Sequence, residues 1–344
     1  MYSYIIKGGK RLQGEIDVSG SKNATLPILA ASILNKDIIK LYNVPNIEDV
    51  KITIKILEHL NCKIKKVKDK LIVDSREMKN IPIPEELMRK LRSSVILAGA
   101  MISRFYTVEF SYPGGCDIGA RPIDLHLSSF KKIGIKVEEE NGKIKCFREK
   151  INKSSIHLDF PSVGATENII LASVLLSNTT TVIENVAMEP EIIDLCKFLN
   201  KLGALIEGAG TNVIKIKGIL KFKKGISYNI MPDRIEAGTF LVAAAITKGD
   251  VRINKVNPED LKSVISKLEE CGANIDIGKN YIHLKMDSRP QAVEIKTMPY
   301  PGFPTDMQAI FTSLLCIAKG TSIVIENIFE NRFKYTRRIK KNGC

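Results

Sequence analysis

The sequence predicts an α/β protein of two inside-out domains, built from a unit of about 70 residues that recurs along the chain. Three observations lead to this fold class. Helix patterns with no polar face alternate with strand patterns that have one, which places the helices inside and the sheets outside. The ends of successive helices recur at nearly equal intervals. The 344 residues also exceed one ordinary core, so two domains are expected.

Five alanine-rich segments predict helices that are buried on every side. They are residues 26–34, 94–102, 169–176, 239–246 and 309–317. A strand pattern ending near an asparagine follows four of them, at residues 39–43, 181–185, 251–254 and 323–327. In the second copy, we expect the loop that begins at Pro113 to fill this place.

An amphipathic helix then ends in a Leu-Gly-Ala-like stop before the next strand. The stops centre on Asn61, Gly134, Gly203 and Gly272, which lie 73, 69 and 69 residues apart. Glycine at such a stop is expected to adopt the left-handed conformation that caps a helix. The segment 219–230, rich in Lys and Gly, interrupts the repeat and is the best candidate for a linker.

Composition restricts the class of protein. The chain is 44% hydrophobic and 26% charged, as in globular proteins. No apolar run approaches the roughly 20 residues that cross a bilayer, and no secretory signal follows Met1. Seven cysteines without a CxxC or Cys/His cluster indicate separate thiols rather than disulfides or a metal site. We therefore expect a cytoplasmic protein without a metal site or a membrane partner. We also expect no cofactor.

The net charge of +14 raises the question of a nucleic-acid partner. The lysines are scattered along helix and strand faces, and no basic helix or aromatic stacking platform is present. We expect no nucleic acid to bind, and the positive field would instead favour small anionic substrates.

The loop after the second apolar helix is the first candidate for chemistry. Its Pro113-Gly114-Gly115 run predicts a mobile loop, with Cys116 at the tip. Arg121 nearby could lower the pKa of this thiol and also bind an anion. These residues alone leave two interpretations open, a reactive cysteine or a half-buried structural one.

Polar residues precede each apolar helix. Helix N-termini carry free N–H groups and partial positive charge, so several of them together make an anion site. Ordinary N-capping accounts for Ser93, Thr166 and Asp306 taken singly. It accounts poorly for Lys22 and Arg92, because a cation at a helix N-terminus opposes the helix dipole. These two residues suggest a bound anion.

Six motifs, in this order, resemble those of the UDP-N-acetylglucosamine 1-carboxyvinyltransferase family. They are Ser21–Ala24, Pro113–His126, Ser162–Thr166, Pro232–Glu236, Phe303–Ala309 and Glu330–Phe333. The resemblance extends from Met1 to the region of Arg332. Six motifs in one order make it highly specific.

This resemblance implies an enolpyruvyl transferase. The reaction transfers the enolpyruvyl group of phosphoenolpyruvate to the 3'-hydroxyl of UDP-N-acetylglucosamine and releases phosphate, as the first committed step of peptidoglycan synthesis. The family fold has two inside-out α/β domains of three units each, with the substrates between them. Residues 21–229 would form the first domain, and residues 1–20 with 230–344 a second, incomplete one. The two substrates are the partners expected, and the oligomeric state is left open.

The resemblance also implies roles around the phosphoenolpyruvate. Cys116 would donate a proton to its methylene group and could form a covalent adduct. Lys22 and Arg121 would hold its phosphate, and Arg92 would contribute to the same anionic pocket. A low-pKa thiol on a glycine-hinged loop is suited to closing over such a pocket.

Further roles follow for the nucleotide sugar. Asn23 and Asp306 would meet the sugar, with Asp306 as the candidate base for its 3'-hydroxyl. The remaining substrate-binding residues would be Arg121, Pro122, Ile123, Asp124, Leu125, Ser162, Val163, Gly164, Arg332 and, through its backbone, Ile328.

Two alternatives remain beside this interpretation. One is the related transferase that acts on shikimate 3-phosphate, although the Pro-Gly-Gly-Cys loop and the Ser162-Val163-Gly164 segment favour the nucleotide sugar. The other is a truncated, inactive relative that at most binds a UDP-sugar.

The end of the chain motivates the second alternative. The repeat stops in its fifth unit, so we expect about a unit and a half to be missing. After Phe333 the period calls for an amphipathic helix ending in a Gly-Ala stop, but the sequence continues as Thr336-Arg337-Arg338 and ends at Cys344. A single inserted nucleotide in the gene would account for this tail. Such a chain is expected to turn over poorly or not at all.

Overall fold

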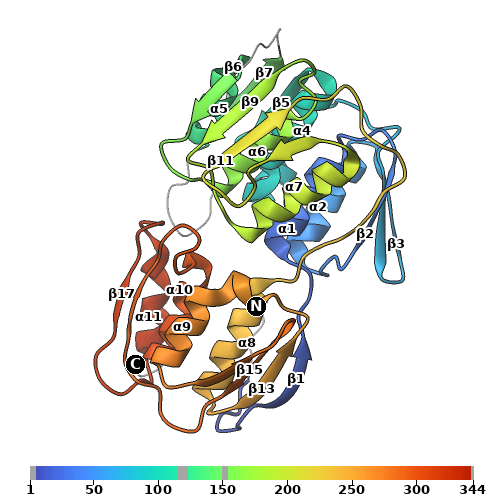
Figure 1. Cartoon of the computed structure of the whole chain (residues 1–344). Coiled ribbons are helices and arrows are strands. Elements are labelled where there is room, and N and C mark those ends of the chain that lie inside the picture. Colours follow the sequence, from blue (N-terminus) through green and yellow to red (C-terminus); the bar gives the residue numbers. More distant parts are fainter. Residues whose placement is uncertain (1–4, 115–122, 149–153, 342–344) are drawn as a thin grey trace. The chain divides into compact units, whose positions relative to one another are not determined.

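The computed structural model describes residues 5–114, 123–148 and 154–341 (Figure 1). The chain forms two compact units. One consists of Ser19–Met231, and the other joins the N-terminal segment through Val18 to the chain from Pro232 onward. The chain therefore passes twice from one unit to the other. No helix in the described ranges is long and apolar enough to cross a bilayer.

The first repeat of the Ser19–Met231 unit forms a four-stranded sheet. Its elements are α1 (Lys22–Ser32), β2 (Ile38–Tyr42), α2 (Glu48–His59), β3 (Lys63–Val67) and β4 (Lys70–Asp74). Strands β2 and β3 both pair with β4 in antiparallel register, and β12 (Ser227–Asn229) joins β2 in parallel register.

Residues 219–230 were expected to form a linker, but their last part is strand β12 of this sheet. The backbone N–H of Ile230 donates to the Tyr42 carbonyl at 3.1 Å, which extends the pairing beyond β12. Ile226 and Ile230 are buried and Ser227 is exposed, as in a strand with one face in the core. The Lys and Gly content of the segment hid this alternation.

The second repeat contains a three-stranded sheet. Its elements are α3 (Glu85–Lys90), η1 (Arg92–Val95), α4 (Ile96–Phe105), β5 (Thr107–Ser111), α5 (Asp124–Lys132), β6 (Ile135–Glu140) and β7 (Lys143–Arg148). Strand β5 pairs with β7 and occupies the place that we assigned to the loop at Pro113. That assignment is wrong, because the loop follows the strand rather than replacing it.

The third repeat restores the four-stranded arrangement. Its elements are β8 (Ser154–His157), α6 (Val163–Ser173), β9 (Thr180–Glu184), α7 (Pro190–Leu202), β10 (Leu205–Glu207) and β11 (Val213–Lys217). Strand β8 runs parallel to β9, as β12 runs parallel to β2. The same supersecondary unit is thus used again within one hydrophobic core.

The other unit repeats this pattern with strands from both ends of the chain. Its elements are β1 (Gln13–Asp17), α8 (Arg234–Ile246), β13 (Asp250–Asn254), η2 (Pro258–Leu261), α9 (Lys262–Glu270), β14 (Asn274–Ile277), β15 (Tyr281–Lys285), β16 (Glu294–Lys296), α10 (Thr305–Leu315), β17 (Ile323–Ile325), η3 (Arg332–Tyr335) and α11 (Thr336–Lys341). Strand β1 pairs in parallel with β13, which explains why the N-terminal segment belongs to this unit (Figure 1).

The apolar helices of the larger unit are buried as predicted. Every residue of Ala24–Ser32 in α1, Ile96–Arg104 in α4 and Ala165–Ser173 in α6 is buried. Helices α8 and α10 differ, because they bury one face and leave residues such as Phe240 and Ile310 half-exposed. The predicted all-round burial therefore holds for the three helices of the Ser19–Met231 unit alone.

The helix stops also agree with the prediction. Gly134, Gly203 and Gly272 have φ angles of 86°, 106° and 97°, and Asn61 has a φ of 68° in the corresponding place. This left-handed conformation ends each amphipathic helix and turns the chain into the next strand. The period of the sequence therefore corresponds to a real structural repeat.

Candidate functional site

The predicted site residues fall into two groups, one in each unit. Cys116, Arg121 and Pro122 lie outside the described residues. The Ser19–Met231 unit contains Lys22, Asn23, Arg92, Ile123, Asp124, Leu125, Ser162, Val163 and Gly164. The other unit contains Asp306, Ile328 and Arg332.

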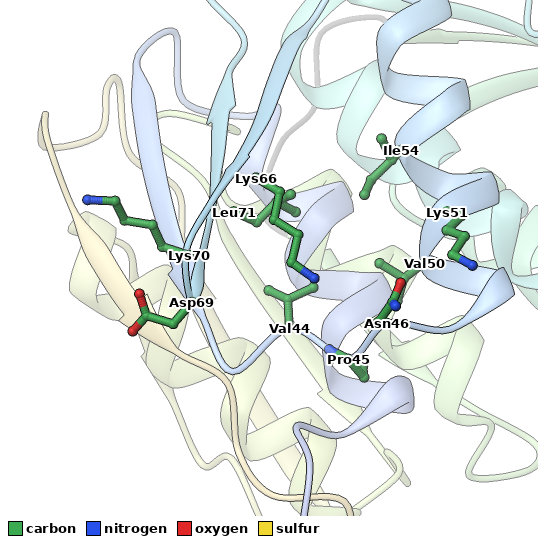
Figure 2. A pocket seen from close by; sticks show the side chains of 10 residues that line it. All are labelled: Val44, Pro45, Asn46, Val50, Lys51, Ile54, Lys66, Asp69, Lys70 and Leu71. Carbon is green, nitrogen blue, oxygen red and sulfur yellow. The ribbon is translucent and has the colours of Figure 1, made fainter.

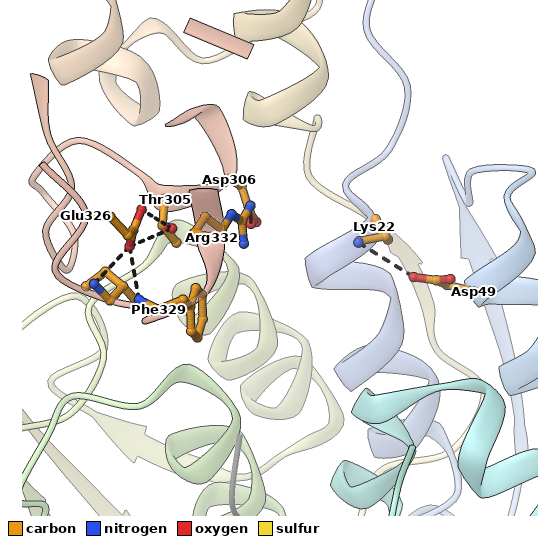
Figure 3. A network of polar contacts seen from close by, with 8 residues as sticks. Lys22, Asp49, Thr305, Asp306, Glu326, Phe329 and Arg332 are labelled. Carbon is orange, nitrogen blue, oxygen red and sulfur yellow. Dashed lines mark hydrogen bonds and ion pairs between the residues drawn. The ribbon is translucent and has the colours of Figure 1, made fainter. Parts of the chain in front are cut away.

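Lys22 is the first residue of α1, and Asn23 is the second. The hydroxyl of Ser21 accepts a hydrogen bond from the Ala24 N–H at 3.3 Å, so it satisfies one of the free donors of this helix end. The Lys22 ammonium lies 3.6 Å from a carboxylate oxygen of Asp49 on α2 (Figure 3). Both side chains are partly exposed, so the cation is held in place at the start of the helix and stays accessible from solvent.

The start of α6 is built in the same way. The Ser162 hydroxyl accepts from the Ala165 N–H at 3.3 Å, and Val163 and Gly164 form the first turn. A side-chain carbon on Gly164 would lie 3.1 Å from His126 Cε1 and 3.3 Å from its Nε2. The glycine therefore allows the imidazole of α5 to approach the beginning of α6.

These caps correct part of the sequence interpretation. Ser93, Thr166 and Asp306 were expected to be explicable as N-caps, but all three lie inside helices. Thr166 instead accepts the Ala187 N–H at 3.2 Å. The capping side chains among the described helices are Ser21, Ser162 and Asp233, the last accepting from two backbone N–H groups. Ordinary capping thus does not explain Asp306.

Asp306 and Arg332 form a direct ion pair in the unit that contains α10. The Arg332 guanidinium donates to Asp306 Oδ1 at 2.9 Å. The Arg332 side chain is 14% exposed and the Asp306 side chain 43% exposed, so a largely buried cation holds an accessible carboxylate (Figure 3). The arrangement orients a partly exposed carboxylate at the first turn of α10.

Glu326 is a residue of this group that the sequence analysis missed. Its carboxylate accepts the N–H of Ile328 at 2.9 Å and of Phe329 at 3.1 Å. It also accepts the hydroxyl of Thr305, the first residue of α10, at 3.0 Å (Figure 3). Glu326 thereby ties the backbone at Ile328 to the helix start that carries Asp306. Only its position two residues before Ile328 could have indicated this role.

We expect Glu326→Ala to raise the KM for the nucleotide sugar that the sequence resemblance implies about tenfold, because the loop at Ile328 loses the charged acceptor that fixes its backbone. Glu326→Gln keeps an oxygen for the two N–H groups and should change KM by less than about threefold. Steady-state phosphate release at varied nucleotide sugar measures both values.

The matched control for Glu326 is Glu294→Ala, which removes an exposed glutamate from the paired strand β16. Its KM should stay at the wild-type value. If Glu326→Ala behaved like this control, the carboxylate would not position the loop.

Figure 2 shows a small surface pocket between α2 and the β3–β4 hairpin. Its volume is about 60 Å³, and its lining includes Val44, Val50 and Leu71 beside the lysines Lys51 and Lys66. Pockets that hold nucleotide-sized ligands occupy roughly 300 Å³ or more. None of the predicted site residues lines this pocket, so it is not the expected substrate site.

Within the described ranges, no group of three or more His, Cys, Asp or Glu side chains lies together as a metal site would require. The described part of the site consists of cations, a carboxylate, helix N-termini and backbone groups. Such groups bind anions and transfer protons.

The chain is similar to known proteins along its whole length. Residues 6–344 match the family described as EPSP synthase (3-phosphoshikimate 1-carboxyvinyltransferase). UDP-N-acetylglucosamine 1-carboxyvinyltransferase 2 of Caldanaerobacter subterraneus subsp. tengcongensis is 51% identical, and the alignment covers 100% of this chain and 82% of that protein. UDP-N-acetylglucosamine 1-carboxyvinyltransferase 1 of Carboxydothermus hydrogenoformans is 46% identical, with 100% and 81% covered.

Solved structures show the same fold at lower sequence identity. The enolpyruvyl transferase NikO from Streptomyces tendae superposes with a TM-score of 0.84 at 20% identity, covering 97% of this chain and 79% of that chain. EPSP synthase from Acinetobacter baumannii gives a TM-score of 0.68 at 19% identity, with 93% and 75% covered. The predicted α/β fold class is thereby confirmed.

Proposed function

The chain belongs to the UDP-N-acetylglucosamine 1-carboxyvinyltransferase family, and we propose that the residues described above perform the reaction of that family in the roles given below. It is an enolpyruvyl transferase that moves the enolpyruvyl group of phosphoenolpyruvate to the 3'-hydroxyl of UDP-N-acetylglucosamine and releases phosphate. This reaction belongs to peptidoglycan synthesis. The observation that carries the conclusion is 51% identity over the full length of the chain.

Lys22 is assigned to the phosphate of phosphoenolpyruvate. It is a partly exposed cation at a capped helix start, where its charge and the positive end of the α1 dipole favour an anion. Arg92 and Arg121 would complete the pocket. Fixed cations of this kind stabilise the negative charge that develops on the departing phosphate.

Asp306 is assigned as the base for the 3'-hydroxyl of the sugar, with Asn23 as a second contact. The pairing with Arg332 supports this role, because it fixes the direction of a carboxylate that stays accessible. Ile328 would bind the nucleotide sugar through its backbone, in a loop that Glu326 holds. The uridine diphosphate is assigned to residues 121–125 together with Ser162, Val163 and Gly164.

We also propose the domain bounds, the cellular location and the physiological role. The first domain comprises residues 21–229, and the second comprises residues 1–20 and 230–344. The protein works in the cytoplasm and serves cell-wall formation, and through it cell shape and division. No cofactor, metal, nucleic acid or membrane takes part in the proposed mechanism.

Acceptor choice tests this function against the shikimate 3-phosphate alternative. Isothermal titration calorimetry should show that UDP-N-acetylglucosamine binds and that shikimate 3-phosphate does not. Phosphate release in the presence of phosphoenolpyruvate should likewise depend on the nucleotide sugar. Binding without phosphate release would support a relative that binds UDP-sugar but is inactive.

Cys116 is expected to be the fastest-reacting thiol of the chain. Burial raises the pKa of Cys62 and Cys271 to about 11 and of Cys146 and Cys196 to about 12, so these four stay protonated at neutral pH. Brief treatment with the epoxide phosphonate fosfomycin, followed by peptide mass spectrometry, should find the label on Cys116.

The Cys116→Ser protein serves as the control for this labelling and should show no rapid adduct. Preferential modification of Cys62, Cys196 or Cys271 in the unaltered protein would overturn the assignment of Cys116. Modification confined to half-buried Cys316 would do the same.

A further inference from the structure

Three segments assigned to substrate binding meet around one buried amide in the Ser19–Met231 unit. Arg92 lies in η1, Asp124 and Leu125 begin α5, and Ser162–Gly164 begin α6. Asn168, one turn further along α6, is fully buried. Its side chain contacts η1, α5 and α4, the helix that directly follows η1.

The hydrogen bonds of Asn168 use each of its polar groups. Its Oδ1 accepts the Gly99 N–H of α4 at 2.7 Å. Its Nδ2 donates to the Val95 carbonyl of η1 at 3.0 Å and contacts His126 Nδ1 of α5 at 2.9 Å. Val95 is the N-cap residue of α4 and Gly99 lies one turn further on, so the amide contacts two successive turns at the start of this helix.

These partners determine the orientation of the amide and the tautomer of the imidazole. A backbone N–H can only donate, so Gly99 must face Oδ1, and the Val95 carbonyl can only accept, so it must face Nδ2. The second hydrogen of Nδ2 then points at His126 Nδ1, which must accept it. The proton of the neutral imidazole is therefore on Nε2.

Close packing leaves little freedom around this cluster. A side-chain carbon on Gly99 would lie 2.4 Å from both the carbonyl oxygen and Oδ1 of Asn168. His126 is 8% exposed and lies against Gly164. Burial, and then the positive charge of Arg92, lower the pKa of His126 to about 4, so the imidazole is neutral at physiological pH.

We propose that Asn168 and His126 are positioning residues that hold η1 and the starts of α5 and α6 in register, so that the phosphoenolpyruvate pocket at Arg92 and the nucleotide-binding segments share one geometry. The inference rests on the proposed function. It assigns to both residues an indirect role, since the amide acts through backbone groups and the imidazole through its Nδ1 acceptor.

Kinetics of three variants test this role. Asn168→Asp keeps an acceptor for Gly99 but has no donor for Val95 or His126, so KM for both substrates should rise about tenfold while kcat changes by less than about threefold. His126→Asn places an acceptor near the Nδ1 position and should retain most of the wild-type KM. His126→Gln places its polar end near the Nε2 position and should resemble Asn168→Asp.

Asn200→Asp is the matched control. Asn200 also makes a two-point amide bridge, to the N–H and carbonyl of Ile206 at 2.9 Å each, but it joins α7 to β10 rather than the substrate segments. The Asn200→Asp substitution should lower the midpoint temperature of thermal unfolding and leave the KM values for both substrates unchanged. Equal KM changes in Asn168→Asp and Asn200→Asp would reduce Asn168 to a general stabilising residue and overturn the proposal.

A spectroscopic measurement tests the geometry without turnover. In protein labelled with ¹⁵N-histidine, the resonances of His126, assigned by their absence from the His126→Asn spectrum, should show a neutral ring protonated at Nε2 from pH 6 to 8. A ring protonated at Nδ1, or one that titrates in this range, would contradict the hydrogen-bond assignment. Because this result needs no substrate, it stands apart from any failure of the proposed function, which loss of phosphate release in the unaltered protein would reveal.

Discussion

Replacing Asp306 by Asn is expected to lower kcat about 10³-fold while the Kd for UDP-N-acetylglucosamine changes by less than about threefold. An amide has nearly the same shape as the carboxylate, and its oxygen can still accept the hydrogen bond that Arg332 donates at 2.9 Å. It cannot take the proton of the 3'-hydroxyl. The loss should therefore fall on the transition state rather than on binding.

Phosphate release measures kcat in this experiment, and calorimetry measures the Kd. Asp287→Asn is the matched control, since Asp287 also pairs with an arginine, Arg11, at 3.2 Å in the same unit. It should have wild-type kinetics. A kcat for Asp306→Asn within a few-fold of wild type would place the base elsewhere.

Replacing Lys22 by Met should lower kcat/KM for phosphoenolpyruvate about 10²-fold. Methionine retains the length and apolar character of the side chain, so the helix start can remain folded while the charge is lost. Asp49 would then lack the cation 3.6 Å away and would add repulsion toward an anionic substrate. Initial rates at varied phosphoenolpyruvate and saturating nucleotide sugar give the value.

Lys51→Met provides the comparison for Lys22. Lys51 lies on α2 and pairs with Glu48 at 3.7 Å, with a side chain about as exposed as that of Lys22. Its loss should leave kcat/KM unchanged. An equal loss of kcat/KM in the two variants would show that net charge matters and that the position of Lys22 does not. An unchanged kcat/KM in both would remove Lys22 from the phosphate site.

The fold could be predicted from the sequence wherever a local pattern of apolar residues indicated a buried face. Nearly all-apolar runs marked α1, α4 and α6, and the regular stops at Gly134 and Gly203 marked the repeat. Both signals arise within a few turns of chain, so they can be read without knowing the tertiary structure. The β12 strand was missed because its pairing with β2 joins residues that are far apart in the sequence.

The site was predictable where residue type departs from a local rule. Lys22 opposes the dipole of its own helix, and this conflict identified it. Glu326 and Asn168 break no such rule, since a glutamate after a short strand and an asparagine in a helix are ordinary. Their roles depend on partners more than twenty residues away, such as Thr305 for Glu326 and Val95 for Asn168. Such contacts become visible only in the folded chain.

The most direct test of the whole account is product analysis with the purified 344-residue chain, phosphoenolpyruvate and UDP-N-acetylglucosamine. Inorganic phosphate is measured together with the mass and proton spectrum of the sugar nucleotide. We expect one phosphate for each sugar nucleotide that gains an enolpyruvyl ether at its 3'-oxygen, and no phosphate when either substrate is omitted. Phosphate release that requires shikimate 3-phosphate instead, or no modified sugar nucleotide at all, would contradict it.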